Sequence, residues 1–218
     1  MSRLQTRAEQ MMHDHGFLGV PLETFESSSR RHFVRLLELG LSPESKVLDI
    51  GCGCLRVGYW LIRFLDPDGY CGIEPSRQRV ELGRRYLFST AELDAKRPRF
   101  AYRADFDTSV FTSRFDVFFA CSIWTHCGKV AIERMLDGFV DDTGPDGTFL
   151  VSYLPATSAD DDYQGSEWVG TSHESTTPGI VRHDPSWLRQ ACDDRRLSVD
   201  ELPGVDSESQ SWLRLTKR

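Results

Sequence analysis

The sequence predicts an α/β fold: a doubly wound, mostly parallel sheet of seven strands with helices on both faces and a helical segment at the N-terminus. Two observations carry this prediction. Short apolar runs alternate with longer runs of helical spacing, which is typical of parallel strands joined by right-handed helical crossovers. The first apolar run, Val47 to Ile50, is followed by Gly51 and Gly53, which allow a sharp turn and a close backbone approach to a ligand.

The N-terminal half begins with two expected helices. Residues 3–14 form the first, which ends before the Gly16 segment. Ser28 to Leu39 form the second, with apolar residues at helical spacing and Gly40 as its stop signal. A strand over Lys46–Ile50, a helix over 55–65, a turn over 66–69, a strand over Tyr70–Glu74 and a helix over Ser76–Ser89 follow.

The C-terminal half continues the alternation. Its expected elements are strands over Arg99–Arg103 and Phe115–Cys121, a helix over Lys129–Val140, a turn over 144–147, a strand over Thr148–Tyr153, a helix over Pro185–Arg195, and strands over Leu197–Leu202 and Gln210–Leu215. Asp184 is the expected N-cap of the late helix, since Pro185 suits its first position. The polar residues 155–184 interrupt the pattern and predict a loop insertion. We expect one domain over residues 1–218, with residues 1–40 as a helical cap.

Composition limits the classes of function. The chain of 218 residues has a net charge of −7, which disfavours a broad surface for binding nucleic acid. Residues 1–100 hold 15 basic and 13 acidic residues, whereas residues 101–218 hold 11 and 20. No apolar run is long enough to span a membrane, and the polar N-terminus resembles no targeting signal. We therefore expect a cytoplasmic protein with six reduced cysteines.

The most informative segment is Lys46-Val47-Leu48-Asp49-Ile50-Gly51-Cys52-Gly53. A buried strand, an acidic residue and a two-glycine turn resemble the first motif of class I methyltransferases, which use S-adenosylmethionine (SAM). Further residues at later strand ends match the same pattern in order: Glu74, Asp105 and the pair Cys121-Ser122. The resemblance covers roughly residues 30–217. It implies an antiparallel last strand and, from the Arg56 region, a bacterial subgroup acting on small molecules.

The resemblance also implies a cofactor site. Glu74 would bind the ribose hydroxyls, Asp105 the adenine amino group beside an apolar neighbour, and a carbonyl near Cys121 the methionine ammonium. The implied cofactor-binding residues are Asp49, Gly51, Cys52, Gly53, Leu55, Arg56, Glu74, Pro75, Asp105, Phe106, Cys121 and Ser122.

A dinucleotide is the rival cofactor. NAD-binding turns prefer Gly-x-Gly-x-x-Gly, and here Arg56 occupies the third glycine position. The acidic Asp49 beside the turn suits the ammonium group of SAM better than a pyrophosphate. The chain also lacks a Tyr-x-x-x-Lys pair, so SAM is the predicted cofactor.

Two residues are catalytic candidates. His126 follows the fourth strand, and an imidazole titrates near neutral pH, so it suits the role of general base. The alternative is that His126 caps or packs near the next helix, or contacts the cofactor. Tyr153 ends the fifth strand, where it can orient an acceptor or serve as an amphipathic wall.

The acceptor side is expected among aromatic and ionisable residues near the loop insertion. The substrate-binding candidates are Trp124, Trp168, His173 and His183. Trp168 and the loop carboxylates suit an amine-bearing acceptor through cation–π and ionic contacts, although a solvated loop is an equal alternative. Near the N-terminus, Arg30 and Arg31 could pair with the SAM carboxylate, but a solvated helix face is preferred.

No metal site is predicted. Cys52 and Cys54 are too close in sequence for the usual zinc pair, so buried, inert thiols are expected.

The predicted function is methyl transfer from SAM to an oxygen or nitrogen of a small-molecule acceptor (EC 2.1.1.-), by a monomer or homodimer. Two alternatives stay open: a SAM-binding protein without catalysis, and a methyltransferase acting on nucleic acid or protein. Ser122-Ile123-Trp124-Thr125 stands where amino-methylating nucleic-acid enzymes carry Asn/Asp-Pro-Pro-Tyr/Phe, which disfavours a nucleic-acid substrate.

Overall fold

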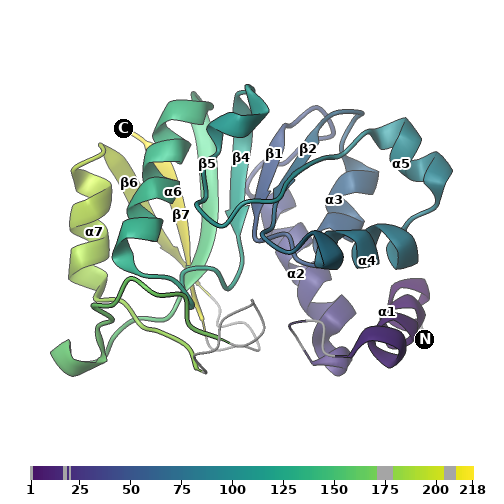
Figure 1. Cartoon of the computed structure of the whole chain (residues 1–218). Coiled ribbons are helices and arrows are strands. Elements are labelled where there is room, and N and C mark those ends of the chain that lie inside the picture. The colour runs from purple at the N-terminus through teal and green to yellow at the C-terminus, as the bar shows by residue number, and fades with distance from the viewer. Residues whose placement is uncertain (1, 17–18, 20, 171–178, 204–209) are drawn as a thin grey trace. The chain divides into compact units, whose positions relative to one another are not determined.

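The computed structural model describes residues 2–16, 19, 21–170, 179–203 and 210–218. It divides into two compact units, Met1–Tyr102 and Arg103–Arg218. Figure 1 labels the helices and strands of both units.

The first unit contains three parallel strands in the order β3-β2-β1. They are β1 (Val47–Ile50), β2 (Tyr70–Ile73) and β3 (Arg99–Ala101). Every residue of β1 and β2 is buried, as expected for a strand that is covered on both faces. In the register of the pair, Ile50 lies beside Ile73, so the segments that follow β1 and β2 leave the sheet at the same edge.

Six helices accompany these strands in the described part of the first unit: α1 (Arg3–His15), the 3-10 helix η1 (Leu22–Thr24), α2 (Phe25–Glu38), α3 (Gly58–Phe64), α4 (Arg77–Leu87) and α5 (Thr90–Lys96). The side chain of Ser76 caps α4 by accepting a hydrogen bond from the Arg79 backbone N–H. Ser89 and Glu92 form a capping box at the start of α5.

The second unit contains four strands in the order β4-β5-β7-β6. They are β4 (Phe115–Ala120), β5 (Thr143–Tyr153), β6 (Leu197–Leu202) and β7 (Ser211–Lys217). β4 and β5 are parallel, whereas β7 runs antiparallel to both of its neighbours, β5 and β6. The helical elements are η2 (Ser109–Phe111), α6 (Lys129–Asp142), η3 (Ala159–Asp161) and α7 (Pro185–Asp193). As predicted, Asp184 caps α7 and accepts a hydrogen bond from the Ser186 N–H.

The predicted fold class is confirmed. The described residues form seven strands, mostly parallel with β7 antiparallel, and helices pack around them. Several predicted boundaries were wrong. The helix expected over 55–65 begins at Gly58, because residues 53–57 form turns first. The strand expected from Thr148 begins at Thr143, where the chain already pairs with Phe115. Helix α5 was not predicted.

Gly83 provides a test of how α4 packs. A Cβ added to this glycine would lie 2.6 Å from the Cys54 carbonyl carbon and 2.9 Å from Leu55 Cγ. We expect Gly83→Ala to lower the free energy of unfolding by about 1–3 kcal/mol, because backbone cannot yield as a flexible side chain can. Urea unfolding measures the effect. Gly144→Ala is the control, since nothing lies within 4 Å of its added Cβ; equal stability of the two variants would contradict this packing.

Candidate active site

The turn after β1 has the backbone that its glycines predict. Gly51 and Gly53 have φ angles of 75° and 53°, and Leu55 follows with a φ of 62°. The N–H groups of Gly51 and Cys52 both donate to the Ile73 carbonyl, at 2.8 and 3.1 Å, which ties the turn to the end of β2. A Cβ added to Gly53 would find its nearest atom 4.0 Å away. At Gly53 the turn therefore presents bare backbone to open space.

Glu74 holds this turn in place from the end of β2. Its carboxylate is buried, with 3% of the residue exposed. One oxygen accepts a hydrogen bond from the Gly53 N–H at 3.0 Å, and the other accepts one from the Ser76 N–H at 3.1 Å. The same carboxylate thus connects the glycine turn with the N-cap of α4.

Asp49 is a second buried carboxylate, within β1 itself. Its pKa is raised to about 7, mainly by burial and to a small extent by the neighbouring charge of Glu74, whereas the Tyr70 hydrogen bond and Arg56 oppose the shift. Tyr70 donates its hydroxyl to Asp49 Oδ2 at 2.7 Å. A buried carboxylate with a raised pKa favours either a proton or a bound cation.

Arg56 is held by a hydrogen bond to helix α2. Its Nη1 donates to Ser28 Oγ at 2.8 Å, and Ser28 Oγ lies 3.2 Å from His32 Nε2. Burial and nearby arginines, Arg56 first among them, lower the pKa of His32, which favours the neutral form of the ring beside Ser28. Ser28 and His32 were missed from the sequence. Arg30 and Arg31 are exposed on the same helix.

In the second unit, Asp105 is exposed and bound by an arginine. Arg103 Nε donates to Asp105 Oδ1 at 2.8 Å, and a second guanidinium nitrogen donates to Oδ2. The Arg103 hydrogen bonds lower the pKa of Asp105 to about 2, with burial opposing this shift. The next residue, Phe106, is buried and has a φ of 58°. Positive φ in a non-glycine residue is strained and clusters at functional sites.

Cys121 and Ser122 follow β4 and are partly exposed. Ser122 also has a φ of 58°. Its N–H donates to Ser152 Oγ at 2.8 Å, and Gln210 Nε2 donates to its Oγ at 2.6 Å. These contacts hold the strained residue at the end of the strand.

His126 is fixed by the backbone of residue 169. Its Nδ1 lies 2.7 Å from the Val169 carbonyl oxygen, and the Val169 N–H donates to the His126 carbonyl at 2.8 Å. Burial lowers the pKa of His126, and the Val169 carbonyl opposes that shift. The imidazole stacks on Trp168 with ring centroids 5.8 Å apart, and the Phe106 ring lies 6.0 Å from Trp168. The structure thus brings together three predicted site residues: His126, Trp168 and Phe106.

The structure places two substrate-binding candidates in the interior. Trp124 and His183 are each 0% exposed. His183 Nε2 lies 2.9 Å from the Trp124 carbonyl and 3.1 Å from the Cys127 carbonyl, so Nε2 carries a proton that both oxygens share. Burial lowers the pKa of His183, so its imidazole is neutral. Their role in acceptor binding stays a prediction.

Three site candidates remain: Tyr153, Pro75 and His173. Tyr153 ends β5 and is buried, and burial raises the pKa of its hydroxyl. Pro75 is exposed beside Glu74. His173 lies outside the described residues.

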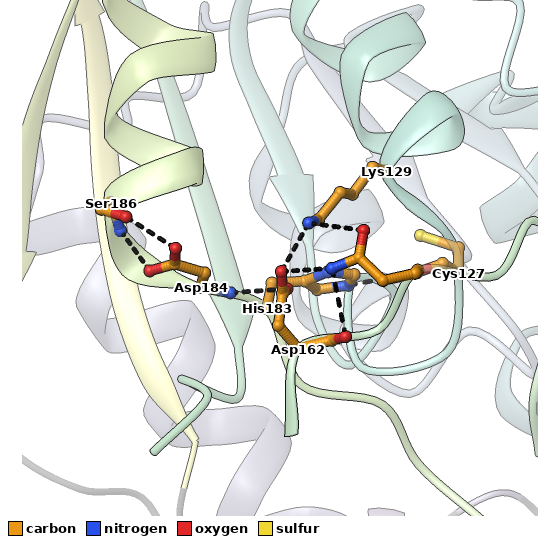
Figure 2. Close-up of polar contacts among 7 residues, drawn as sticks. Cys127, Lys129, Asp162, His183, Asp184 and Ser186 are labelled. Carbon is orange, nitrogen blue, oxygen red and sulfur yellow. Dashed lines mark hydrogen bonds and ion pairs between the residues drawn. The ribbon is translucent and has the colours of Figure 1, made fainter. Parts of the chain in front are cut away.

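An ion pair holds the insertion near the start of α6 (Figure 2). Lys129 Nζ donates to Asp162 Oδ2 at 2.6 Å. Gln164 Nε2 donates to the same oxygen at 2.6 Å, and the Asp184 N–H donates to Oδ1 at 2.9 Å. Lys129 and Asp162 are 33 residues apart, and no pattern in the sequence identifies them as partners.

The cysteines are six free thiols, of which Cys121 alone is partly exposed and the others are buried. Burial raises the pKa of Cys54 to about 11 and raises that of Cys52 well above its usual range. Within the described ranges, the His, Cys, Asp and Glu side chains form no group of three that could hold a metal ion. None of the described helices is long and apolar enough to cross a membrane.

Solved SAM-dependent methyltransferases have the same fold as this chain. The magnesium protoporphyrin IX methyltransferase ChlM from Synechocystis PCC 6803 with bound SAM matches with a TM-score of 0.66 and 12% identity, over 100% of this chain and 98% of that one. The DhpI complex with SAH, the demethylated form of SAM, matches with a TM-score of 0.62 and 14% identity, over 98% and 93%. The glycopeptide N-methyltransferase MtfA matches with a TM-score of 0.62 and 14% identity, over 89% and 90%. No protein-family model matches the chain.

The raised pKa of Asp49 predicts a pH-dependent stability. Because the folded state favours the protonated carboxyl, the stabilising contribution is complete below pH ~4 and is lost as the pH rises through about 7. An asparagine at this position cannot ionise and still accepts the Tyr70 hydroxyl. We therefore expect the difference between the free energies of unfolding, that of Asp49→Asn minus that of the original chain, to increase with pH. The increase should be about 3–4 kcal/mol between pH ~4 and ~8.5.

Urea unfolding across that pH range measures this difference. Asp116→Asn, which removes an exposed carboxylate from β4, is the control. A difference for Asp49→Asn that does not change with pH would show that Asp49 is not held in its protonated form.

Proposed function

We propose that the chain is a SAM-dependent methyltransferase that acts on an oxygen or nitrogen of a small-molecule acceptor. The observation that carries the proposal is the junction after β1 and β2, where buried Glu74 holds a bare glycine turn beside buried Asp49. The methyltransferase fold supports it. Among solved neighbours, one is named for magnesium protoporphyrin IX and another for a glycopeptide, which favours a small-molecule acceptor without identifying it.

The residues of the first unit fit SAM. The open space at Gly53 admits a ligand against the backbone. A carboxylate accepts about four hydrogen bonds, so Glu74 can bind ribose hydroxyls while it holds the turn. Asp49, which favours a proton or a cation, suits the positive charge that SAM carries. Arg56, held by Ser28, suits the SAM carboxylate.

In the second unit, Asp105 and Phe106 are the proposed adenine contacts. Phe106 supplies a buried apolar face, and Asp105 is a carboxylate that Arg103 keeps ionised and therefore able to accept an amino hydrogen. Cys121 and Ser122 are the proposed contacts of the methionine end. Their positions at the end of β4 agree with the rule that ligands of α/β sheets bind beyond the carboxyl ends of strands.

SAM, when bound, supplies a methyl group already activated by its sulfonium, so the residues of the chain mainly position the acceptor and remove a proton. His126 is the proposed base. With Nδ1 donating to the Val169 carbonyl, Nε2 of the neutral ring carries the lone pair that takes a proton. Tyr153 and Trp168 are proposed to position the acceptor.

The chain is proposed to work as one domain over 1–218, in the cytoplasm, as a monomer or homodimer. Residues 1–40 are proposed as a helical cap, and residues 155–184 as an insertion on the acceptor side.

The ribose role of Glu74 is tested by calorimetry with SAM. Glu74→Gln should weaken binding by about 1–3 kcal/mol, because a charged acceptor is lost. A 3′-deoxy analogue of SAM, which lacks one proposed partner, should lose less affinity in the variant than SAM does. Ser76→Ala is the control, since it weakens the α4 cap without changing the carboxylate. Equal losses for SAM and the analogue would remove Glu74 from the ribose role.

The base role of His126 is tested by turnover of an acceptor found by screening metabolites with labelled SAM. His126→Gln should lower kcat by roughly 10²–10⁴ with little change in SAM affinity. Because burial lowers its pKa, His126 is deprotonated at neutral pH, so kcat should rise with pH at a midpoint below 6.5 and then stay level.

The matched control is His13→Gln, which removes an exposed imidazole from α1 and should leave kcat unchanged. If His126→Gln keeps most of the activity, the enzyme works by positioning alone and needs no base.

A further inference from the structure

We propose that Gly170 is a positioning residue: its missing side chain lets the backbone of residues 169–170 hold the His126 imidazole with the proton on Nδ1 and the lone pair on Nε2. The catalytic meaning of this arrangement rests on the proposed function, but the arrangement itself does not. We call residues 163–170 the strap.

The protonation of His126 follows from its partner. A carbonyl oxygen can only accept, so the 2.7 Å contact with Val169 requires a proton on Nδ1. The Val169 N–H also donates to the His126 backbone carbonyl, so two hydrogen bonds join the same two residues. This pair fixes both the position and the rotation of the ring. In a neutral imidazole, the lone pair then lies on Nε2.

Glycine is required beside this contact for two reasons. Gly170 has a φ of 115°, which side chains rarely adopt. A Cβ added there would lie 2.6 Å from His126 Nδ1 and 2.9 Å from its Cε1. Any side chain at position 170 would therefore push against the ring edge that makes the hydrogen bond to Val169.

Contacts other than those to His126 also hold the strap, so a displaced imidazole would not move the strap with it. Tyr163 donates its backbone N–H to the Arg182 carbonyl and its hydroxyl to the Glu167 carbonyl, each at 2.9 Å. A Cβ added to Gly128 would overlap the Gly165 carbonyl oxygen, so the two backbones touch. Trp168 adds an aromatic face against the imidazole, with an interplanar angle of 29°.

The chain offers a matched control for the backbone strain. Gly179 has a φ of 114°, almost equal to that of Gly170, and an added Cβ would find its nearest atom, Val169 Cγ1, at 3.8 Å. Alanine at either position bears a similar conformational cost. Only alanine at position 170 meets His126.

The experiment uses ¹⁵N NMR of the histidine side chains in the full chain, which has six histidines. Comparison with His126→Gln assigns the His126 signals. We expect a protonated Nδ1 and an unprotonated Nε2 at a pH of about 7.5, where the ring is neutral. His183, whose Nε2 carries the proton, provides the opposite pattern as an internal reference. Gly170→Ala should lose the His126 pattern, and Gly179→Ala should keep it.

Kinetics gives a second measurement. Gly170→Ala should lower kcat by about 10²-fold, the scale of an ångström-sized misplacement, with SAM affinity unchanged, whereas Gly179→Ala should retain kcat.

A proton on Nε2 of His126 in the original chain would overturn the proposal without any variant, even if Gly170→Ala failed to fold. An unchanged His126 spectrum in Gly170→Ala would also overturn it. The expected spectra with a fully active His126→Gln would instead refute only the base role.

Discussion

The first unit depends on one buried carboxylate, that of Glu74. It accepts hydrogen bonds from the turn after β1, at Gly53, and from the cap of α4, at Ser76, although these two segments lie far apart in the chain. A buried N–H without a partner costs more than the net value of the bond it replaces. The shape of the turn, the start of α4 and the approach of Gly83 to Cys54 therefore all require an acceptor at the end of β2.

The sequence predicted most of the sheet because buried parallel strands are continuous apolar runs, as in β1 and β4. It missed α5 because no residue of that helix is buried, so apolar periodicity is absent; the capping box of Ser89 and Glu92 was the available signal. It predicted a turn over residues 144–147, which lie within β5, because Pro and Gly usually end strands. The register between β4 and β5 passes from Thr143 beside Phe115 directly to Thr148 beside Val117, so residues 144–147 form an irregularity within the strand.

The candidate site could be predicted only in part, for a different reason. Motif residues such as Glu74 and His126 carry recognisable side chains at strand ends. Their partners do not: Val169 acts through a backbone carbonyl, and Ser28 binds Arg56 from a helix 28 residues away. A hydrogen bond from a backbone group does not depend on which residue supplies it, so the sequence does not reveal it. A polar residue on a helix face is expected to be solvated unless its burial is known. Tertiary placement determines both.

The burial of five of the six cysteines determines which thiol can react with an electrophile. Thiolates, not thiols, react, and burial raises the pKa of Cys71 and Cys192 to about 11, as it does for Cys54. The five enclosed sulfurs are therefore protected from alkylation and oxidation by both access and protonation. Cys121, partly exposed beside the strained Ser122, is left as the position at which a reactive label would enter the folded molecule.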